Sequence, residues 1–245
     1  MRAIRIHVDA DLKAGIELAL PEQAGAHLAR VLRLRTGDAV SLFNGDGNDY
    51  AAELIAVGPR ETRVRVLGAT ANGSESPLRI VLAQALARGE KMDWIVQKAT
   101  ELGVAEIVPL VTARSEVKLD EGRARKRLEH WRAVAISACE QCGRARVPEI
   151  GAVQPLREWL SSLDPDATAT RLALLPEGES GARELRAMPD TAVLAVGPEG
   201  GFDEVDSALL RRANFKGLRL GPRVLRTETA GVAGIAALQA LYGDF

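Results

Sequence analysis

The residues best suited to chemistry lie in two segments near the end of the 245-residue chain, each of which begins with Gly-Pro. The apolar run Thr191–Val196 stops at Gly197-Pro-Glu-Gly-Gly201, and the run Gly217–Leu220 stops at a second such segment, residues 221–230. Glycine lacks a Cβ, so backbone N–H and C=O groups can lie against a flat ligand there. Ligands of open α/β sheets bind where parallel strands end. The pattern predicts one pocket lined by main chain, although ordinary strand-to-helix turns have a similar composition.

The elements that must position these segments alternate between strand and helix from Leu78 onward. Alternation of this kind predicts a parallel sheet with crossover helices. A nucleotide loop of the dehydrogenase type is a poor match, because no G-x-G-x-x-G opens a helix after the first strand. The expected strands are Leu78–Ala85, Glu106–Val111, Arg171–Leu175 and the two apolar runs above; the expected helices are Lys91–Leu102, Gly122–Cys142, a short one after Pro155, one around Ala182–Ala187, and Thr229–Tyr242.

The first 70 residues have a different pattern, in which short strands follow one another closely. The expected strands are Ile4–Val8, Ala39–Phe43, Tyr50–Val57 and Thr62–Leu67, with one helix at about Pro21–Leu32. Such spacing is typical of a small barrel. Gly68–Pro77 has no periodicity and consists of linker-type residues. We therefore expect one domain at residues 1–70, a linker at 71–77 and a second domain at 78–245.

Composition narrows the class of protein. The 47% of hydrophobic residues suffices for a core, and a net charge of −1 argues against RNA binding by bulk charge, so any RNA contact must come from local clusters. Without a twenty-residue apolar stretch or a signal-peptide pattern, we expect a cytoplasmic protein. Cys139 and Cys142 lack two further metal ligands, so we expect no metal; reduced thiols are favoured over a redox pair.

Four motifs together resemble the RsmE family of S-adenosylmethionine-dependent methyltransferases, which belongs to the SPOUT superfamily. They are GPEGGF at 197–202, LGPRVLRTETA at 220–230, QKATELGV at 97–104 and ACEQCGRARVPEI at 138–150. HLARVLRLRTGD at 27–38 is also similar to the RNA-binding domain of that family. The resemblance implies methylation of uridine N3 in 16S ribosomal RNA of the small ribosomal subunit.

The resemblance also implies a fold and an assembly. The fold would be α/β, with a SPOUT-type parallel sheet tied in a carboxy-terminal trefoil knot and an amino-terminal PUA-like β-barrel that grips RNA. Family members are homodimers with the active site at the subunit interface. Gly231, Gly234 and the alanines of the last helix would permit such close packing, or would instead pack against the sheet of the same chain.

The cofactor of the family is S-adenosyl-L-methionine, and the resemblance assigns two kinds of site residue. Arg226 would stabilise the uracil anion, and Glu228 would orient Arg226, accept the proton or cap the last helix together with Thr227. Glu199 would contact ribose hydroxyls or stabilise its own loop. The implied cofactor-binding residues are Leu175, Gly197, Pro198, Glu199, Gly200, Gly201, Leu220, Gly221, Val224, Leu225, Arg226 and Thr227.

Basic residues of the amino-terminal domain are the candidates for RNA contacts. On the helix at 21–32, His27 and Arg30 lie three residues apart, beside an expected core stripe of Leu28, Val31 and Leu32. Without the resemblance this cluster would be read as a solvated face, as the run Arg123–Arg127 is. Arg144 and Arg146 reach either a phosphate or a partner subunit. The full set is Arg2, Arg5, His27, Arg30, Arg33, Arg35, Arg144 and Arg146.

Two other functions compete with this hypothesis. One is a non-catalytic RNA-binding protein that has lost its cofactor, which the intact segments at 197–201 and 220–230 argue against. The other is a SPOUT enzyme that acts on transfer RNA or on a different atom. The identity of the methylated nucleoside separates these hypotheses.

Overall fold

The computed structural model describes residues 4–58, 61–117, 120–165, 168–178, 180–185 and 190–245. The chain forms two compact units. The first consists of residues 1–75 together with Cys139–Val147, and the second of Ser76–Ala138 together with Pro148–Phe245.

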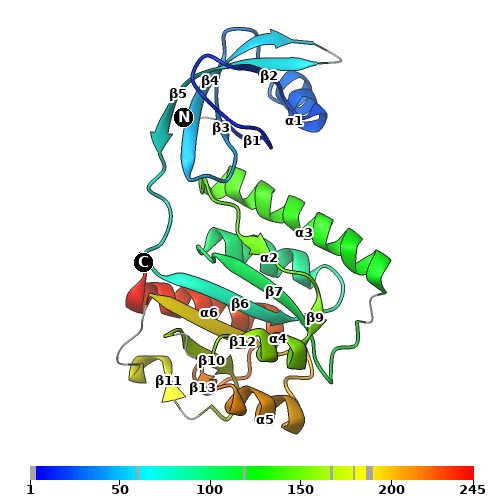
Figure 1. Cartoon of the computed structure of the whole chain (residues 1–245), viewed down its shortest axis with the longest axis vertical. Coiled ribbons are helices and arrows are strands. Elements are labelled where there is room, and N and C mark those ends of the chain that lie inside the picture. Colours follow the sequence, from blue (N-terminus) through cyan, green and yellow to red (C-terminus); the bar gives the residue numbers. More distant parts are fainter. Residues whose placement is uncertain (1–3, 59–60, 118–119, 166–167, 179, 186–189) are drawn as a thin grey trace. The chain divides into compact units, whose positions relative to one another are not determined.

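The first unit is built on a five-stranded sheet with the order β1-β3-β4-β5-β2. Only β1 and β3 pair in parallel; the other pairs are antiparallel. Two register shifts between β4 and β5 bend these long strands, as β-bulges do. The sheet therefore curls into a half-barrel (Figure 1), so the expected PUA-like domain is present with an open edge instead of a closed barrel. The strands are β1 Arg5–His7, β2 Glu17–Ala19, β3 Ala39–Phe43, β4 Asn48–Val57 and β5 Thr62–Ala71.

The strands of this unit alternate buried and exposed residues, which places one face of the sheet against a core. That core contains Leu42, Leu54 and Val64, none of which is exposed to solvent. β5 runs to Ala71, into the segment where linker-type residues predict no regular structure. The strand β2 was not expected, because Glu17-Leu-Ala19 is too short to show a period.

The helix expected at 21–32 divides into two parts with different geometry. An α-helical turn, α1 (Glu22–Ala26), leads directly into a π-helical turn, η1 (His27–Val31), in which the Leu32 N–H donates to the His27 carbonyl at 3.1 Å. The wider turn rotates later residues outward. Leu28 is 1% exposed, whereas Val31 is 64% exposed. The expected core stripe of Leu28, Val31 and Leu32 is therefore wrong beyond Leu28.

The second unit contains an eight-stranded sheet in which every pair is parallel. Its order is β11-β13-β10-β12-β6-β7-β8, and β9 pairs with β7. The last strand lies beside β10, two places from the strand that precedes it in sequence, and this arrangement is SPOUT-like. The strands are β6 Arg79–Ala85, β7 Glu106–Val111, β8 Glu149–Ile150, β9 Gln154–Pro155, β10 Thr170–Leu174, β11 Ser180–Gly181, β12 Thr191–Val196 and β13 Lys216–Arg219.

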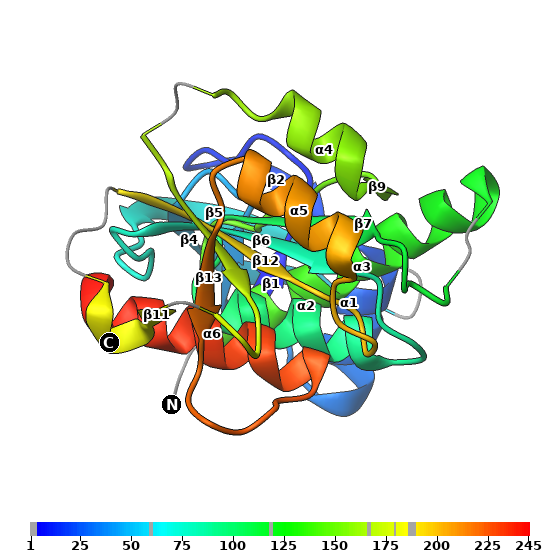
Figure 2. The same cartoon turned by 90° about the horizontal axis from the view of Figure 1, so that it is seen from below.

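Helices cover both faces of this sheet, as Figure 2 shows. α2 and α6 pack on one face, and α4 and α5 lie on the other. The helices are α2 Lys91–Glu101, α3 Glu121–Cys142, α4 Leu156–Ser162, α5 Glu204–Arg212 and α6 Thr227–Tyr242, with a short 3₁₀ turn, η2, at Ala182–Glu184. The expected helix around Ala182–Ala187 is reduced to this turn, and its last residues lie outside the described residues.

Burial on both faces explains why the central strands are continuous apolar runs. In β12, the residues Ala192–Val196 are all buried. Gly231 and Gly234 of α6 face the sheet, because a Cβ at Gly234 would lie 2.8 Å from Leu194 Cδ2. These glycines therefore serve close packing within the chain.

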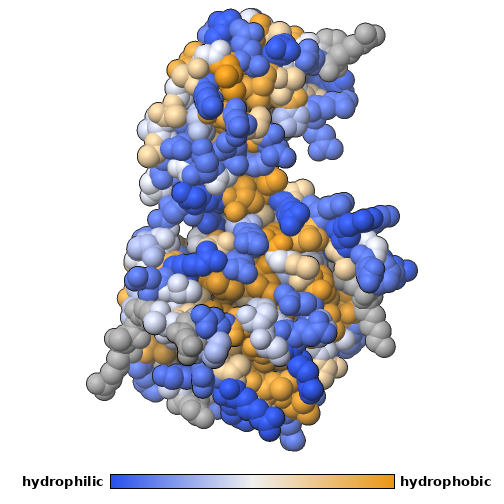
Figure 3. All heavy atoms as spheres, viewed as in Figure 1, coloured by the Kyte–Doolittle hydropathy of each residue, from blue (hydrophilic) through white to orange (hydrophobic). Residues whose placement is uncertain are grey.

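The surface of the second unit has no uniform character. Figure 3 shows hydrophilic residues (blue) interspersed with hydrophobic ones (orange) on the face drawn. Among the described residues, no helix has the length and hydrophobicity needed to cross a membrane.

Candidate functional site

The loops that follow three neighbouring strands of the second unit enclose one pocket. It has a volume of about 610 Å³ and lies at the carboxyl ends of β10, β12 and β13. The segments 174–177, 196–202 and 218–227 supply most of its wall. Parallel strands place their carboxyl ends at one edge, which is why segments far apart in sequence meet there.

The loop after β12 is shaped by glycine at two positions. Gly201 has a φ of 68°, a conformation that residues with a Cβ rarely adopt. A Cβ at Gly197 would lie 3.0 Å from the backbone of Gly201 and Phe202. The loop therefore folds back on itself and presents main chain to the pocket.

A lysine at the start of α2 connects this loop to the start of α6. Lys91 Nζ donates to Glu199 Oε1 at 2.9 Å and lies 3.5 Å from Glu228 Oε2. The hydrogen bond with Glu199 is the main cause that raises the pKa of Lys91 above its ordinary value. Burial alone would raise the pKa of Glu199, but hydrogen bonds from Lys91 Nζ and from the Arg88 N–H outweigh it and lower this pKa. Both groups are therefore charged at neutral pH.

A second cation braces the same loop from the segment after β7. Arg114 Nη1 donates to the carbonyl oxygen of Gly200 at 2.7 Å. A Cβ at Gly200 would lie 3.3 Å from Arg114 Cβ and Cδ, so only glycine allows the side chain to lie this close without displacement.

A buried chain of hydrogen bonds joins the segment that follows β12 to the segment that follows β13. Thr227 Oγ1 donates to the Gly197 carbonyl at 2.6 Å and accepts from Gln84 Nε2 at 3.0 Å. Gln84 is fully buried in β6, and its Nε2 also donates to the Ala85 carbonyl at 3.0 Å. A buried amide is costly unless it is hydrogen-bonded. These bonds fix the start of α6 against the loop after β12.

The two residues proposed for catalysis lie on either side of Thr227. Arg226 is the N-cap residue of α6, lines the pocket and is exposed. It has no ion-pair partner among the described residues. Glu228, by contrast, does not line the pocket, and its side chain is 18% exposed and turned toward Lys91.

The structure brings all of the predicted cofactor-binding residues into the wall of this single pocket. They are Leu175, Gly197, Pro198, Glu199, Gly200, Gly201, Leu220, Gly221, Val224, Leu225, Arg226 and Thr227. Sequence reasoning missed Lys91, Arg114 and Gln84 as partners of these loops. Lys91 follows the carboxyl end of β6, so the strand-end rule was the signal that would have found it. Arg114 follows β7 in the same way.

Four of the predicted RNA-contact residues form an exposed basic group in the first unit. His27 and Arg30 lie on η1, and Arg33 and Arg35 follow it. Arg33 has a φ of 55°, which is uncommon for a residue with a Cβ. The chain reverses there, and the Arg35 N–H donates to Asp38 Oδ2 at 2.6 Å.

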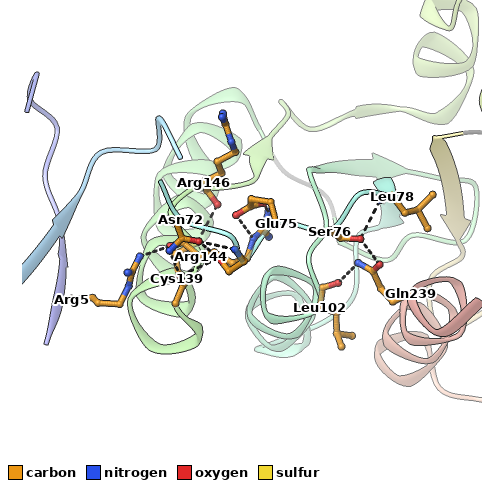
Figure 4. A network of polar contacts seen from close by, with 12 residues as sticks. Arg5, Asn72, Glu75, Ser76, Leu78, Leu102, Cys139, Arg144, Arg146 and Gln239 are labelled. Carbon is orange, nitrogen blue, oxygen red and sulfur yellow. Dashed lines mark hydrogen bonds and ion pairs between the residues drawn. The ribbon is translucent and has the colours of Figure 1, made fainter. Parts of the chain in front are cut away.

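The side chains of two other predicted RNA contacts, Arg5 and Arg144, are buried in this unit. Figure 4 shows their polar contacts. Arg5 is paired with Asp49, and its Nη2 donates to the Arg144 carbonyl at 2.9 Å. Arg144 is paired with both carboxylate oxygens of Glu75, at 3.2 and 2.7 Å. Neither side chain is exposed, so both stay candidates for RNA contacts without an accessible guanidinium in this structure. A phosphate contact by either would require an internal ion pair to open.

The segment that follows α3 explains this burial. Cys139 and Ala145 pack against Phe43 of β3, so residues 139–147 belong to the core of the first unit. Asn72 Nδ2 donates to the Gly143 carbonyl at 3.0 Å and to Asp49 at 2.7 Å, which anchors part of the expected linker (Figure 4). Arg146 is exposed beside Gly47, and Arg2 lies outside the described residues.

The cysteines are free thiols in the structure. Burial raises the pKa of Cys139 to about 12. Among the described residues, no group of three or more His, Cys, Asp or Glu side chains is placed to hold a metal ion.

Comparison with protein families gives two matches along the chain. Residues 74–239 match the RNA methyltransferase domain, and residues 20–67 match the RNA methyltransferase PUA domain. The first match alone covers about two thirds of the chain.

Similar proteins and structures agree with these matches. The ribosomal RNA small subunit methyltransferase E of Bacillus subtilis is 33% identical over 239 residues, with 89% of each chain covered. That of Buchnera aphidicola from Schizaphis graminum is 30% identical, with 99% of this chain and 98% of the relative covered. The solved structure of the ribosomal RNA small subunit methyltransferase E of Neisseria gonorrhoeae, bound to S-adenosyl methionine, has a TM-score of 0.94 at 37% identity, with both chains fully covered.

Proposed function

This chain belongs to the RNA methyltransferase family, and on that basis we propose that it transfers the methyl group of S-adenosylmethionine to N3 of a specific uridine in 16S ribosomal RNA. The single observation that supports this most strongly is the pocket in which all the predicted cofactor-binding residues meet. The relatives and the neighbour described above are named ribosomal RNA small subunit methyltransferase E, and the neighbour was solved with S-adenosyl methionine.

The pocket fits this cofactor in size and chemistry. Its volume of about 610 Å³ lies within the range of small-molecule sites. Leu174, Leu175 and Leu218 offer apolar surface to an adenine ring. Backbone groups of Leu220, Val224 and Leu225 line the same pocket, where they can hydrogen-bond the ring edge. The loop at 197–201 then holds the rest of the molecule through main chain, because its glycines leave room for it.

The cofactor supplies a methyl group that its sulfonium already activates, so the protein must mainly align the reactants. Holding two reactants in line is worth roughly 7–11 kcal/mol of barrier. Uridine N3 loses its proton and attacks the methyl carbon, and negative charge on the uracil oxygens must be stabilised. Arg226 is placed for this role, because its guanidinium is always charged, lines the pocket and is unpaired among the described residues.

Glu228 acts either as the proton acceptor or as a positioning residue for Arg226. Its ion pair with Lys91, at 3.5 Å, favours the positioning role, because this contact fixes the first turn of α6. The variant Glu228→Gln keeps the shape but cannot accept a proton as a carboxylate. A loss of kcat with unchanged KM for RNA would assign proton acceptance, and a rise in KM with little change in kcat would assign positioning.

The first unit binds RNA through its exposed basic residues. His27, Arg30, Arg33 and Arg35 lie within nine consecutive positions, and Arg146 is exposed as well. Phosphate contacts of this kind make affinity depend on salt. Arg30→Ala combined with Arg33→Ala should weaken RNA binding and flatten its salt dependence, whereas the same pair of changes at the solvated cations Arg125 and Arg127 of α3 is the matched control.

We further propose that the protein works as a cytoplasmic homodimer. Trp94 of α2 and Leu241 of α6 are 41% and 45% exposed on helices that pack together. The two side chains lie near opposite ends of this helix pair, since Lys91 is close to Glu228 and Leu102 to Gln239, and a second copy of the chain would cover both. Sedimentation at micromolar concentration should give twice the mass of the chain. A mass equal to that of one chain would refute the dimer.

The reaction itself is tested on small ribosomal subunits that lack the modification. The purified protein is incubated with these subunits, or with bare 16S RNA, and labelled S-adenosylmethionine, and the RNA is digested to nucleosides for mass analysis. The expected product is 3-methyluridine. A different methylated nucleoside, or methylation of transfer RNA instead, would refute the substrate assignment, and binding of S-adenosylmethionine without any product would favour a non-catalytic protein.

A further inference from the structure

The pocket wall carries more positive charge than a methyl-donor site needs. Its lining includes five cationic side chains but only two carboxylates. The cations are Lys91, Arg114, Arg219, Arg223 and Arg226, and the carboxylates are Glu177 and Glu199.

Two of these cations have structural partners inside the wall. Lys91 is paired with Glu199 and lies near Glu228, and Arg114 holds the Gly200 carbonyl. The other three, Arg219, Arg223 and Arg226, are exposed and have no hydrogen-bond or ion-pair partner among the described residues. They follow one another along the segment from the end of β13 to the start of α6.

The charge of the cofactor does not account for these arginines. S-adenosylmethionine carries a sulfonium, an ammonium and one carboxylate, so it is a net cation. Its single carboxylate offers one negative charge, and positive charge beyond that opposes the binding of a net cation. Arg226 is already assigned to the uracil anion. Arg219 and Arg223 therefore remain without a role in binding the donor.

We propose that Arg219 and Arg223 form a subsite for the RNA phosphates that flank the target uridine, at the mouth of the methyl-donor pocket. This inference rests on the proposed function, because it places the second substrate beside the same pocket. RNA is the reactant that brings excess negative charge, and guanidinium groups bind phosphate through paired hydrogen bonds. Phosphate contacts at this point fix the register of the strand, so that the uridine base reaches Arg226.

The exposed loop that carries these arginines suits such a contact. Gly221, which lies between them, has a φ of 80°, and Val224, directly after Arg223, is 82% exposed, so this end of the pocket wall is open to solvent. The subsite is separate from the basic group at 27–35, which belongs to the first unit.

The test uses the full-length double variant Arg219→Gln and Arg223→Gln. Its matched control is Arg211→Gln with Arg212→Gln on α5, which removes the same charge from exposed residues outside this pocket. Affinity for S-adenosylmethionine is measured by calorimetry. RNA affinity is measured at several salt concentrations with an oligonucleotide that contains the target uridine and its flanking nucleotides.

We expect the double variant to bind S-adenosylmethionine within about twofold of the unmodified protein. Its slope of log affinity against log salt should fall by about 0.7 for each phosphate that the variant no longer binds, the value for single-stranded nucleic acid. The control should keep the original slope. A weaker affinity for S-adenosylmethionine with an unchanged RNA slope would assign the arginines to the donor and overturn the proposal; so would an equal loss of slope in the control, or no change at all. The proposed function is tested separately, by analysing the nucleosides of RNA that has been incubated with the unmodified protein. That result does not depend on the salt slope.

Discussion

The hydroxyl of Thr227 is the group whose removal should loosen the two pocket segments from each other. Its Oγ1 donates to Gly197 in the loop after β12 and accepts from Gln84 in β6. Thr227→Val replaces the hydroxyl by a methyl group of similar size and leaves the rest of the side chain in place. Thr227→Ser keeps the hydroxyl and is the matched control.

The cost of the valine variant follows from the two buried hydrogen bonds that it removes. Gln84 Nε2 keeps its bond to Ala85 but loses the one to Thr227, and the Gly197 carbonyl loses its hydroxyl donor. Each lost buried bond costs about 1–3 kcal/mol, so the two together should cost roughly 2–6 kcal/mol. In a chain of this size each kcal/mol lowers Tm by about 2–4 °C, which gives an expected drop of roughly 4–24 °C.

The assay combines thermal unfolding with calorimetric titration of S-adenosylmethionine. Thr227→Val should lower Tm and weaken binding at least about tenfold, the equivalent of roughly 1.4 kcal/mol transmitted to the pocket. Gln84→Leu combined with Thr227→Val should cost less than the sum of the single changes, because both ends of one hydrogen bond are then apolar. Unchanged binding in Thr227→Val, or strict additivity in the double variant, would refute the idea that this bond positions the walls.

Three further outcomes follow from contacts within the second unit and from the burial of one thiol. Lys91→Met should move the acid loss of S-adenosylmethionine binding to higher pH, because Lys91 is one of the two hydrogen-bond donors that lower the pKa of Glu199 and so keep its carboxylate charged at low pH; Lys91→Arg should restore the profile, and identical profiles would contradict this. Gly200→Val should weaken that binding at least about tenfold while Tm changes by less than about 4 °C, because the new side chain meets Arg114 at an exposed loop; equal titration curves would exclude the loop from the site. Cys139, whose pKa is about 12, should resist thiol reagents at pH 8 until the protein unfolds, as peptide mass mapping will show; rapid labelling of the folded protein would contradict its burial.

The sequence predicted best those features that a local pattern determines. The bounds Thr191–Val196 agree with β12, because a strand buried on both faces must be apolar at every position. Glycine turns and strand ends predicted where the pocket lies, whereas the full set of cofactor-binding residues came from the resemblance to the RsmE family. α5 was missed although Asp203 caps it, accepting from the Asp206 N–H at 2.7 Å; this N-cap was a readable signal.

Features that depend on distant contacts could not be predicted in this way. Lys91 and Glu199 are 108 positions apart, and Gln84 and Thr227 are 143 apart. The periodicity of hydrophobic residues along the chain cannot predict contacts between residues this far apart. The π-helical turn η1 likewise follows an ordinary helical pattern, so only the structure shows that Val31 faces solvent.

The hydrogen bond between Gln84 and Thr227 explains why a pocket lined by main chain needs polar side chains in the sheet beneath it. A wall of glycine carbonyls and N–H groups binds a ligand only when its atoms are fixed, yet glycine is the residue with the most backbone freedom to lose. Side-chain bonds from outside the loops supply the missing restraint: Thr227 and Arg114 each hold a glycine carbonyl, and Lys91 holds Glu199. Replacing these ties by apolar residues would leave the fold its hydrophobic core but would free the loops, so ligand affinity should fall together with part of the global stability.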